Sequence, residues 1–183
     1  MTRIIAGKYR GRKLSVADGR AIRPTTDKMR ERIFSMLEHP RYPDLNKARV
    51  ADLFAGTGAL GLEALSRGAS HVTFVEKSPA SIKNLEGNIT TLAVQDDVSI
   101  LKVSARNLPI TKVPYDFIFM DPPYRTGLVE PTLKSISSSN WLTDNAVIIV
   151  ELATDDEITL PEKLHLIDER RQGQQRVIFL NQG

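Results

Sequence analysis

The sequence predicts an α/β fold with a doubly wound, mostly parallel sheet of seven strands, a C-terminal antiparallel hairpin and a small basic N-terminal extension. From residue 48 onward, short apolar runs alternate with amphipathic segments, which is the pattern of repeated βαβ units. Residues 165–180 then hold two strand-like runs around Gly173 with no room for a helix between them, so these runs should pair antiparallel. The first 49 residues follow neither pattern.

Composition predicts each element of this fold. Five apolar, β-branched runs predict the strands that precede the hairpin, at residues 48–54, 71–76, 97–103, 115–121 and 146–152. Three amphipathic segments between them predict helices at residues 59–68, 78–92 and 128–138. Ser78 is a favourable N-cap residue for the second helix, and Pro79 suits its first turn. Strand and helix signals therefore alternate throughout this region.

The N-terminal segment predicts a hairpin that turns near Gly7 and Gly11, followed by a helix. Thr26 or Asp27 caps this helix, and its buried stripe consists of Met29, Ile33 and Met36 or Leu37. We expect the basic residues of this helix, Lys28, Arg30 and Arg32, to lie away from the buried stripe or at its rim.

Charge is distributed unevenly along the chain. Residues 1–49 contain 13 Lys and Arg against 5 Asp and Glu, a net charge of +8, whereas residues 50–183 contain 12 against 17, a net charge of −5. A basic extension on an acidic body is typical of a protein that binds a polyanion. We therefore expect a polyanion-binding extension over residues 1–49 and a cofactor-binding domain over residues 50–183.

Composition also excludes several kinds of site. The chain contains no cysteine, which excludes disulfides, thiolate metal sites and a cysteine nucleophile. Its three histidines, His39, His71 and His165, are far apart in the sequence, so we expect no metal site. No apolar run reaches 18 residues and the N-terminus has no apolar signal core, so we expect a cytoplasmic protein that does not bind membranes.

The first strand leads into the sequence Asp-Leu-Phe-Ala-Gly-Thr-Gly-Ala-Leu-Gly, whose glycines 56, 58 and 61 match a nucleotide-binding fingerprint. Glu76 ends the next strand, 20 residues after Gly56, where an acid can accept hydrogen bonds from a ribose diol. This pattern predicts a nucleoside-containing cofactor, and it fits both NAD and S-adenosylmethionine. Asp52 favours the second, because a carboxylate there suits the ammonium of methionine and not a pyrophosphate.

A second motif, Asp121-Pro122-Pro123-Tyr124, ends the strand predicted at residues 115–121. The two prolines fix an extended chain without N–H donors, so the Asp121 carboxylate and the Pro122 carbonyl remain as acceptors. Acceptors beside an aromatic ring suit the exocyclic amino group of a nucleobase. With both amine hydrogens held, the nitrogen lone pair can point at an electrophile, and Asp121 can take up the proton that the nitrogen loses.

With these motifs, the chain resembles the bacterial RsmD family of 16S ribosomal RNA guanine-N2 methyltransferases, which are class I S-adenosylmethionine-dependent enzymes. The resemblance rests on residues 3–14, 23–37, 52–61, 75–77 and 121–124. It implies a Rossmann-like methyltransferase fold, S-adenosyl-L-methionine as cofactor, and 16S rRNA or the small ribosomal subunit as partner. It also implies guanine 966 as the target, and we expect a monomer.

The motifs and the resemblance together imply three sets of site residues. The catalytic set is Asp121, Pro122 and Tyr124, with Tyr124 stacking on the base. The cofactor set lies in the glycine loop and after the next two strands: Asp52, Phe54, Gly56, Thr57, Gly58, Glu76, Lys77, Ser104 and Ala105. The RNA-binding set is basic: Arg10, Arg12, Lys13, Arg23, Lys28 and Arg30. Many class I enzymes bind adenine through an acid after the third strand; here Ser104 and the Ala105 backbone take that place.

Three alternatives stay open at this stage. Related Asp-Pro-Pro-Tyr turns also serve methyltransferases that act on adenine N6 or on glutamine N5. An NAD oxidoreductase would share the glycine loop but has no use for the second motif. A ribosome-assembly protein without enzymatic activity would keep the basic extension and would tolerate the loss of Asp121.

Overall fold

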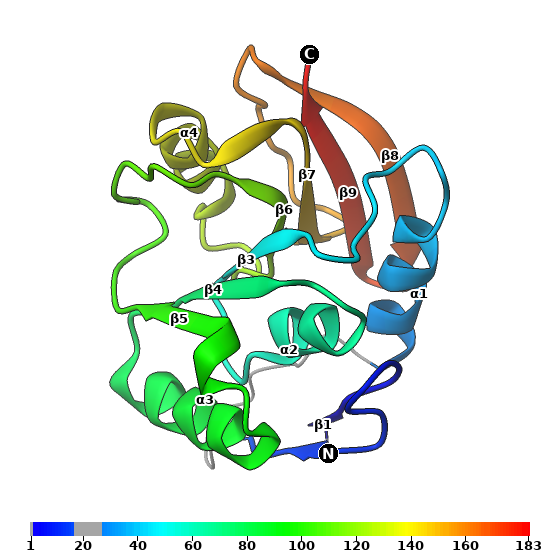
Figure 1. The fold of residues 1–183 in the computed structure, drawn as a ribbon. Helices are drawn as coiled ribbons and strands as arrows, with labels where there is room; N and C mark the ends of the chain where they lie inside the picture. The colour runs from blue at the N-terminus through cyan, green and yellow to red at the C-terminus, as the bar shows by residue number, and fades with distance from the viewer. Residues whose placement is uncertain (1, 17–26) are drawn as a thin grey trace.

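Seven strands form one sheet in the order β5-β4-β3-β6-β7-β9-β8 (Figure 1). The computed structural model describes residues 2–16 and 27–183. The strands are β3 (Arg49–Leu53), β4 (His71–Val75), β5 (Val98–Leu101), β6 (Tyr115–Met120), β7 (Leu142–Ala153), β8 (Leu164–Gln172) and β9 (Gln175–Gln182). The predicted fold class is therefore confirmed.

Strand β9 is antiparallel to the other strands of this sheet. The pairs from β5 through to β7 are all parallel, whereas β9 pairs antiparallel with β7 on one side and with β8 on the other. The C-terminal hairpin is thus present, but its second strand is inserted next to β7 and its first strand forms the edge. The strand predicted at residues 146–152 is longer than expected, because β7 begins at Leu142.

Helices cover both faces of the sheet, as a doubly wound fold requires. One face packs against α1 (Asp27–Leu37), α2 (Ala59–Ser66) and α3 (Pro79–Leu92), and the opposite face packs against α4 (Val129–Ser138) (Figure 1). A short 3-10 helix, η1 (Gln95–Asp97), precedes β5. Alternate residues of the buried strands belong to the two cores: Phe117 and Phe119 lie in the first, and Ile118 and Met120 in the second.

The N-terminal hairpin is fastened to α2. Its strands, β1 (Thr2–Arg3) and β2 (Lys13–Leu14), pair antiparallel beside α2 (Figure 1). The amides of Ile5 and Ala6 donate to the buried carboxylate of Glu63 over 2.7 and 3.0 Å. Gly7 packs so closely that a Cβ atom there would lie 1.8 Å from the Ser66 carbonyl oxygen. The hairpin is therefore an integral layer on α2.

Arg30 corrects one prediction about α1. Its side chain is fully buried, whereas the sequence predicts it outside the buried stripe. The guanidinium donates to the Arg3 carbonyl and to Asp27, and its Nε atom lies 3.9 Å from the Glu63 carboxylate. Burial lowers the pKa of Arg30, and the neighbouring carboxylates Asp27 and Glu63 oppose that shift. Arg30 therefore joins α1 to the hairpin and α2.

Within residues 2–16 and 27–183, no helix has the length and apolar character needed to cross a membrane.

Candidate active site

The register of the sheet brings both motifs to one place. Leu53, the last residue of β3, lies opposite Val75 of β4 on one side and Met120 of β6 on the other. The glycine loop, Glu76 and the Asp-Pro-Pro-Tyr turn therefore begin side by side, at the carboxyl ends of adjacent parallel strands. Strand order also reverses between β3 and β6, and open α/β sheets bind ligands at such a point.

The glycine loop leaves β3 through unusual backbone conformations. Phe54 adopts a φ of 64°, which a bulky side chain rarely does, and Gly56 and Gly58 have φ values of 54° and 79°. A Cβ atom on Gly58 would lie 2.4 Å from a terminal methyl group of Leu85, so the Leu85 side chain of α3 would have to move to admit it. Among the described residues, a Cβ atom on Gly56 would meet no atom closer than the Phe54 carbonyl oxygen, at 3.8 Å. The loop therefore has open space at Gly56 for a ligand.

Glu76 joins the glycine loop to the start of α3. One carboxylate oxygen accepts the Gly56 amide at 3.0 Å, and the other accepts the amides of Lys77 and Ser78, both at 2.8 Å. Three backbone amides therefore converge on this carboxylate and hold it beside the loop. Lys77 contributes its amide to this arrangement while its side chain is exposed.

Asp52 lies beneath the loop, with a side chain that is only 2% exposed. Its carboxylate accepts the Gly61 amide of α2 at 2.9 Å. Burial raises the pKa of Asp52 to about 8; the Gly61 hydrogen bond opposes this shift, and the charge of Glu76 adds to it. Asp52 is therefore a buried acid whose charge depends on what lies above it, for example an ammonium group.

Asn88 of α3 connects Thr57 to the N-terminal hairpin. Its amide nitrogen donates to the Thr57 carbonyl at 2.9 Å and to the Ser15 carbonyl at 3.1 Å, and its amide oxygen accepts the Ser15 amide at 2.8 Å. The side chain is 1% exposed. One buried amide thus links the glycine loop to the end of the basic hairpin.

Ser104 and Ala105 follow β5, the strand that pairs with β4 on the side away from β3. Ala105 is buried, and Ser104 is partly exposed, with its hydroxyl accepting the Arg106 amide at 3.4 Å. The strand that these residues follow is not a neighbour of β6, which leads into the Asp-Pro-Pro-Tyr turn. They lie at the far side of the glycine loop, past Glu76.

The Asp-Pro-Pro-Tyr turn continues β6. Pro122 is buried, and Asp121 and Tyr124 are partly exposed. The Tyr124 hydroxyl donates to the Glu151 carboxylate at 2.5 Å, and the Gln175 amide donates to the same oxygen at 2.7 Å. After the tyrosine, Arg125 adopts a φ of 55° and forms an exposed ion pair with Asp155 at 2.7 Å.

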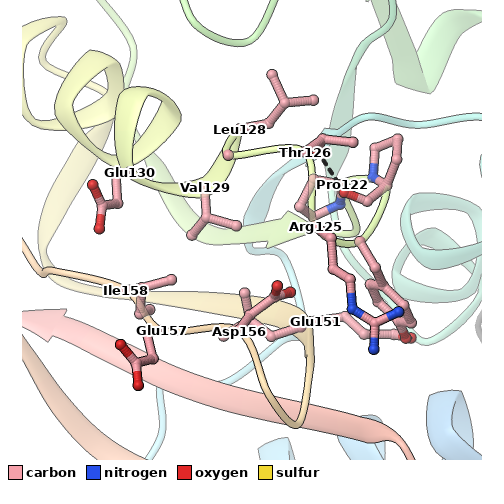
Figure 2. A pocket seen from close by; sticks show the side chains of 14 residues that line it. Pro122, Arg125, Thr126, Leu128, Val129, Glu130, Glu151, Asp156, Glu157 and Ile158 are labelled. Carbon is pink, nitrogen blue, oxygen red and sulfur yellow. Dashed lines mark hydrogen bonds between the residues drawn. The ribbon is translucent and has the colours of Figure 1, made fainter.

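A cavity of about 260 Å³ opens beside this turn. In Figure 2, the loop with Pro122, Arg125 and Thr126 borders one side, and Glu151, Asp156 and Glu157 border the other. Val129 and Ile158 add apolar side chains to the wall. The cavity is thus rich in acceptors, and Arg125 adds a cation at the turn.

The residues predicted to bind RNA differ in their exposure to solvent. Arg10, Arg12, Lys13 and Lys28 are exposed, as binding to phosphates requires. Arg30 is buried and ion-paired, so this residue is withdrawn from the RNA-binding set. Arg23 lies outside the described residues.

Comparison with known proteins assigns the chain to a family. The model of the family described as Conserved hypothetical protein 95 matches residues 2–181. A protein named ribosomal RNA small subunit methyltransferase D from Escherichia coli strain K12 is 40% identical over 174 residues, covering 94% of this chain and 85% of its own. The chain belongs to the RsmD family.

Other members of the RsmD family agree with this assignment. The Haemophilus influenzae protein of the same name is 36% identical over 176 residues, which cover 93% of this chain and 89% of that protein. A solved structure titled as a putative methyltransferase from Escherichia coli superposes with a TM-score of 0.85 at 37% identity, covering 98% of this chain and 97% of that one. The chain is thus a methyltransferase by family and by fold.

Sequence reasoning missed two polar residues at this site, Glu151 and Asn88. Glu151 had a usable signal, because it is an acid at the end of an apolar strand, as Asp52 and Glu76 are. Asn88 had none, since its partners at positions 15 and 57 are far away in the sequence. Across the described residues, no group of three or more His, Asp or Glu side chains is arranged to hold a metal ion.

Proposed function

We propose that this protein transfers a methyl group from S-adenosylmethionine to the exocyclic N2 atom of a guanine in 16S ribosomal RNA, guanine 966 by its resemblance to the family. One observation carries the proposal. The glycine loop and the Asp-Pro-Pro-Tyr turn leave adjacent strands, with Leu53 opposite Met120, so a nucleoside cofactor and a base amine would meet between them.

The cofactor residues fit S-adenosylmethionine. The open space at Gly56 admits a ligand close to the backbone, Glu76 would face a ribose diol, and the buried acid Asp52 matches an ammonium group. Lys77 would contribute its backbone, and Ser104 and Ala105 would border the adenine. The sulfonium of this cofactor supplies an activated methyl group, so the protein mainly has to position the reactants.

Asp121 and the Pro122 carbonyl would hold the two hydrogens of the guanine amine, and the Tyr124 ring would stack on the base. The grip turns the nitrogen lone pair toward the methyl carbon. As the nitrogen–carbon bond forms and the sulfur–carbon bond breaks, the nitrogen loses one proton, which Asp121 can accept. The acceptors Asp156 and Glu157 beside the turn suit a base whose pairing edge carries N–H donors.

The exposed basic residues of the N-terminal hairpin and of α1 support an RNA substrate. Arg10, Arg12, Lys13 and Lys28 would contact phosphates, which sets the orientation of the RNA but does not select its sequence. The names of the relatives supply the ribosomal substrate: several are called ribosomal RNA small subunit methyltransferase D. We propose a cytoplasmic monomer acting on 16S rRNA or the small subunit.

Mass mapping of 16S rRNA tests the proposal. RNA from cells that lack this protein should miss one N2-methylguanine that reappears when the purified protein and labelled S-adenosylmethionine are added. Free RNA and small subunits should be assayed separately. Methyl transfer to adenine N6 or to glutamine N5, or restoration of ribosome assembly by an inactive variant, would overturn it.

A further inference from the structure

A buried polar cluster stands directly behind the tyrosine of the Asp-Pro-Pro-Tyr turn. Glu151 and Gln175 are both 3% exposed, and the Gln175 amide meets the Tyr124 hydroxyl at one oxygen of the Glu151 carboxylate. Burying a carboxylate and an amide is unfavourable unless their hydrogen bonds are satisfied. The three members therefore depend on one another for their hydrogen bonds. Apolar residues at this strand end would carry no such cost of burying polar groups.

Strand pairing explains why these residues converge. Met120 lies opposite Val150, which puts Glu151 next to the start of the turn. Glu151 lies opposite Val177 and Ala153 opposite Gln175, so both polar side chains point to the same face of the β7–β9 pair. The insertion of β9 beside β7 thus places a hydrogen-bond donor next to the buried carboxylate.

The cluster positions the Tyr124 ring and does not transfer a proton. Burial and the hydrogen bond to Glu151 both raise the pKa of Tyr124 above its ordinary value. The phenol is therefore neutral at physiological pH, and its O–H group donates a hydrogen bond to Glu151. A neutral phenol is not a base for the amine proton. Its hydroxyl bond instead fixes where the ring lies, on a turn whose next residue, Arg125, already has a left-handed backbone.

We propose that Glu151, held in place by Gln175, is a positioning residue that fixes the Tyr124 ring in the orientation in which it stacks on the target base. This inference rests on the proposed function. The Gln175 amide and the Tyr124 hydroxyl both donate to the same Glu151 oxygen, so this oxygen anchors the hydroxyl end of the ring at one point on β7.

Single-turnover methyl transfer, with S-adenosylmethionine and RNA both saturating, tests the inference with three variants. Tyr124→Phe removes the donor and Glu151→Met removes the acceptor at similar length, so each should slow transfer by roughly 10- to 100-fold, the scale for a small misplacement of a reacting group. Cofactor affinity should stay the same in both. Glu151→Gln keeps an acceptor oxygen for both donors and should recover most of the rate.

Two further measurements separate positioning from stability. The double variant Tyr124→Phe with Glu151→Met should be no slower than the slower single variant, because both changes break one interaction. Tyr115→Phe is the matched control: it removes the hydroxyl bond of another tyrosine on β6, donated to Thr73 at 3.0 Å, away from the turn. It should leave the rate unchanged, and thermal unfolding should be followed for every variant.

The possible results are distinct. A wild-type protein that methylates no ribosomal RNA overturns the proposed function itself. An active wild type whose single-variant losses multiply in the double variant, or whose Tyr124→Phe form keeps the full rate, overturns the positioning role alone. A loss of cofactor affinity in step with the melting temperature would show a merely structural cluster and would overturn it equally.

Discussion

At the scale of single residues, Asp121 is the group on which the proposed chemistry depends. Replacing Asp121 with Ala removes an acceptor for the amine and a base for its proton, so we expect single-turnover methyl transfer to fall by roughly 10²-fold or more. Cofactor affinity should change little, because the glycine loop belongs to β3 and α2. Asp155→Ala is the control, since Asp155 is an exposed acid near the turn that forms an ion pair with Arg125. A near-normal rate for Asp121→Ala would leave the turn without a catalytic role.

Asp52 makes a prediction about pH. Its pKa of about 8 means that it is largely protonated at neutral pH, whereas an ammonium ligand requires the carboxylate. Binding below pH 8 must then release a proton, so affinity for S-adenosylmethionine should fall as pH decreases from 8 to 6, by up to about tenfold per unit. Above pH 8 the affinity should level off.

The same pKa fixes the sign of the effect on stability. Because the pKa in the folded state is raised above its unfolded value, the contribution of Asp52 to stability is greatest at low pH and is lost as pH rises to about 8. Asp52→Asn should abolish both dependences. Equilibrium dialysis and urea unfolding between pH 6 and 9 measure them, and an affinity that is flat over this range would exclude Asp52 as the partner of the ammonium.

At the scale of elements, the docking of the hairpin on α2 can be tested with two glycines. Gly7 and Gly11 have similar φ values, 78° and 82°, so Ala costs about 1–2 kcal/mol of backbone strain at either. The new Cβ at Gly7 would also meet the Ser66 carbonyl oxygen, at 1.8 Å, whereas no atom of the described residues lies within 4 Å of a Cβ at Gly11. Gly7→Ala should therefore lower the free energy of unfolding by clearly more than Gly11→Ala, as measured in urea. Equal losses of unfolding free energy would mean that the hairpin shifts on α2 to accommodate the new Cβ atom at little cost.

The elements are largely predictable because their signals are local. Strand ends, the glycine loop and the Asp-Pro-Pro-Tyr turn each occupy a short stretch of sequence, and parallel pairing brings carboxyl ends together without further information. The prediction for Arg30 is wrong because it placed the residue outside the buried stripe on the basis of its charge. By helical spacing Arg30 lies four residues before Phe34, on the buried side of α1. Its partner Glu63 and the cluster of Tyr124, Glu151 and Gln175 depend on long-range packing that no local pattern reveals.

At the scale of the whole molecule, charge separates the two tasks of the protein. The basic hairpin carries Arg10, Arg12 and Lys13 on its surface, and the remainder of the chain from residue 50 has a net charge of −5. An acidic body repels phosphate, so the basic side chains should supply most of the affinity for RNA. Asn88 still ties the hairpin to the glycine loop, which keeps this basic surface fixed relative to the loop.

This separation yields the last prediction. Replacing Arg10, Arg12 and Lys13 with Ala should weaken RNA binding and flatten its dependence on salt, by about 0.7–0.9 log unit for each phosphate that the protein no longer neutralises. Cofactor affinity should be unchanged, because all three side chains are exposed and lie on a different element from the glycine loop. The matched control changes three exposed lysines of other elements to Ala, which removes the same charge: Lys112, Lys134 and Lys163. RNA affinity is measured for both variants at several salt concentrations. Coincident salt slopes for the two triple variants would show that net charge alone attracts RNA and that the hairpin does not hold it.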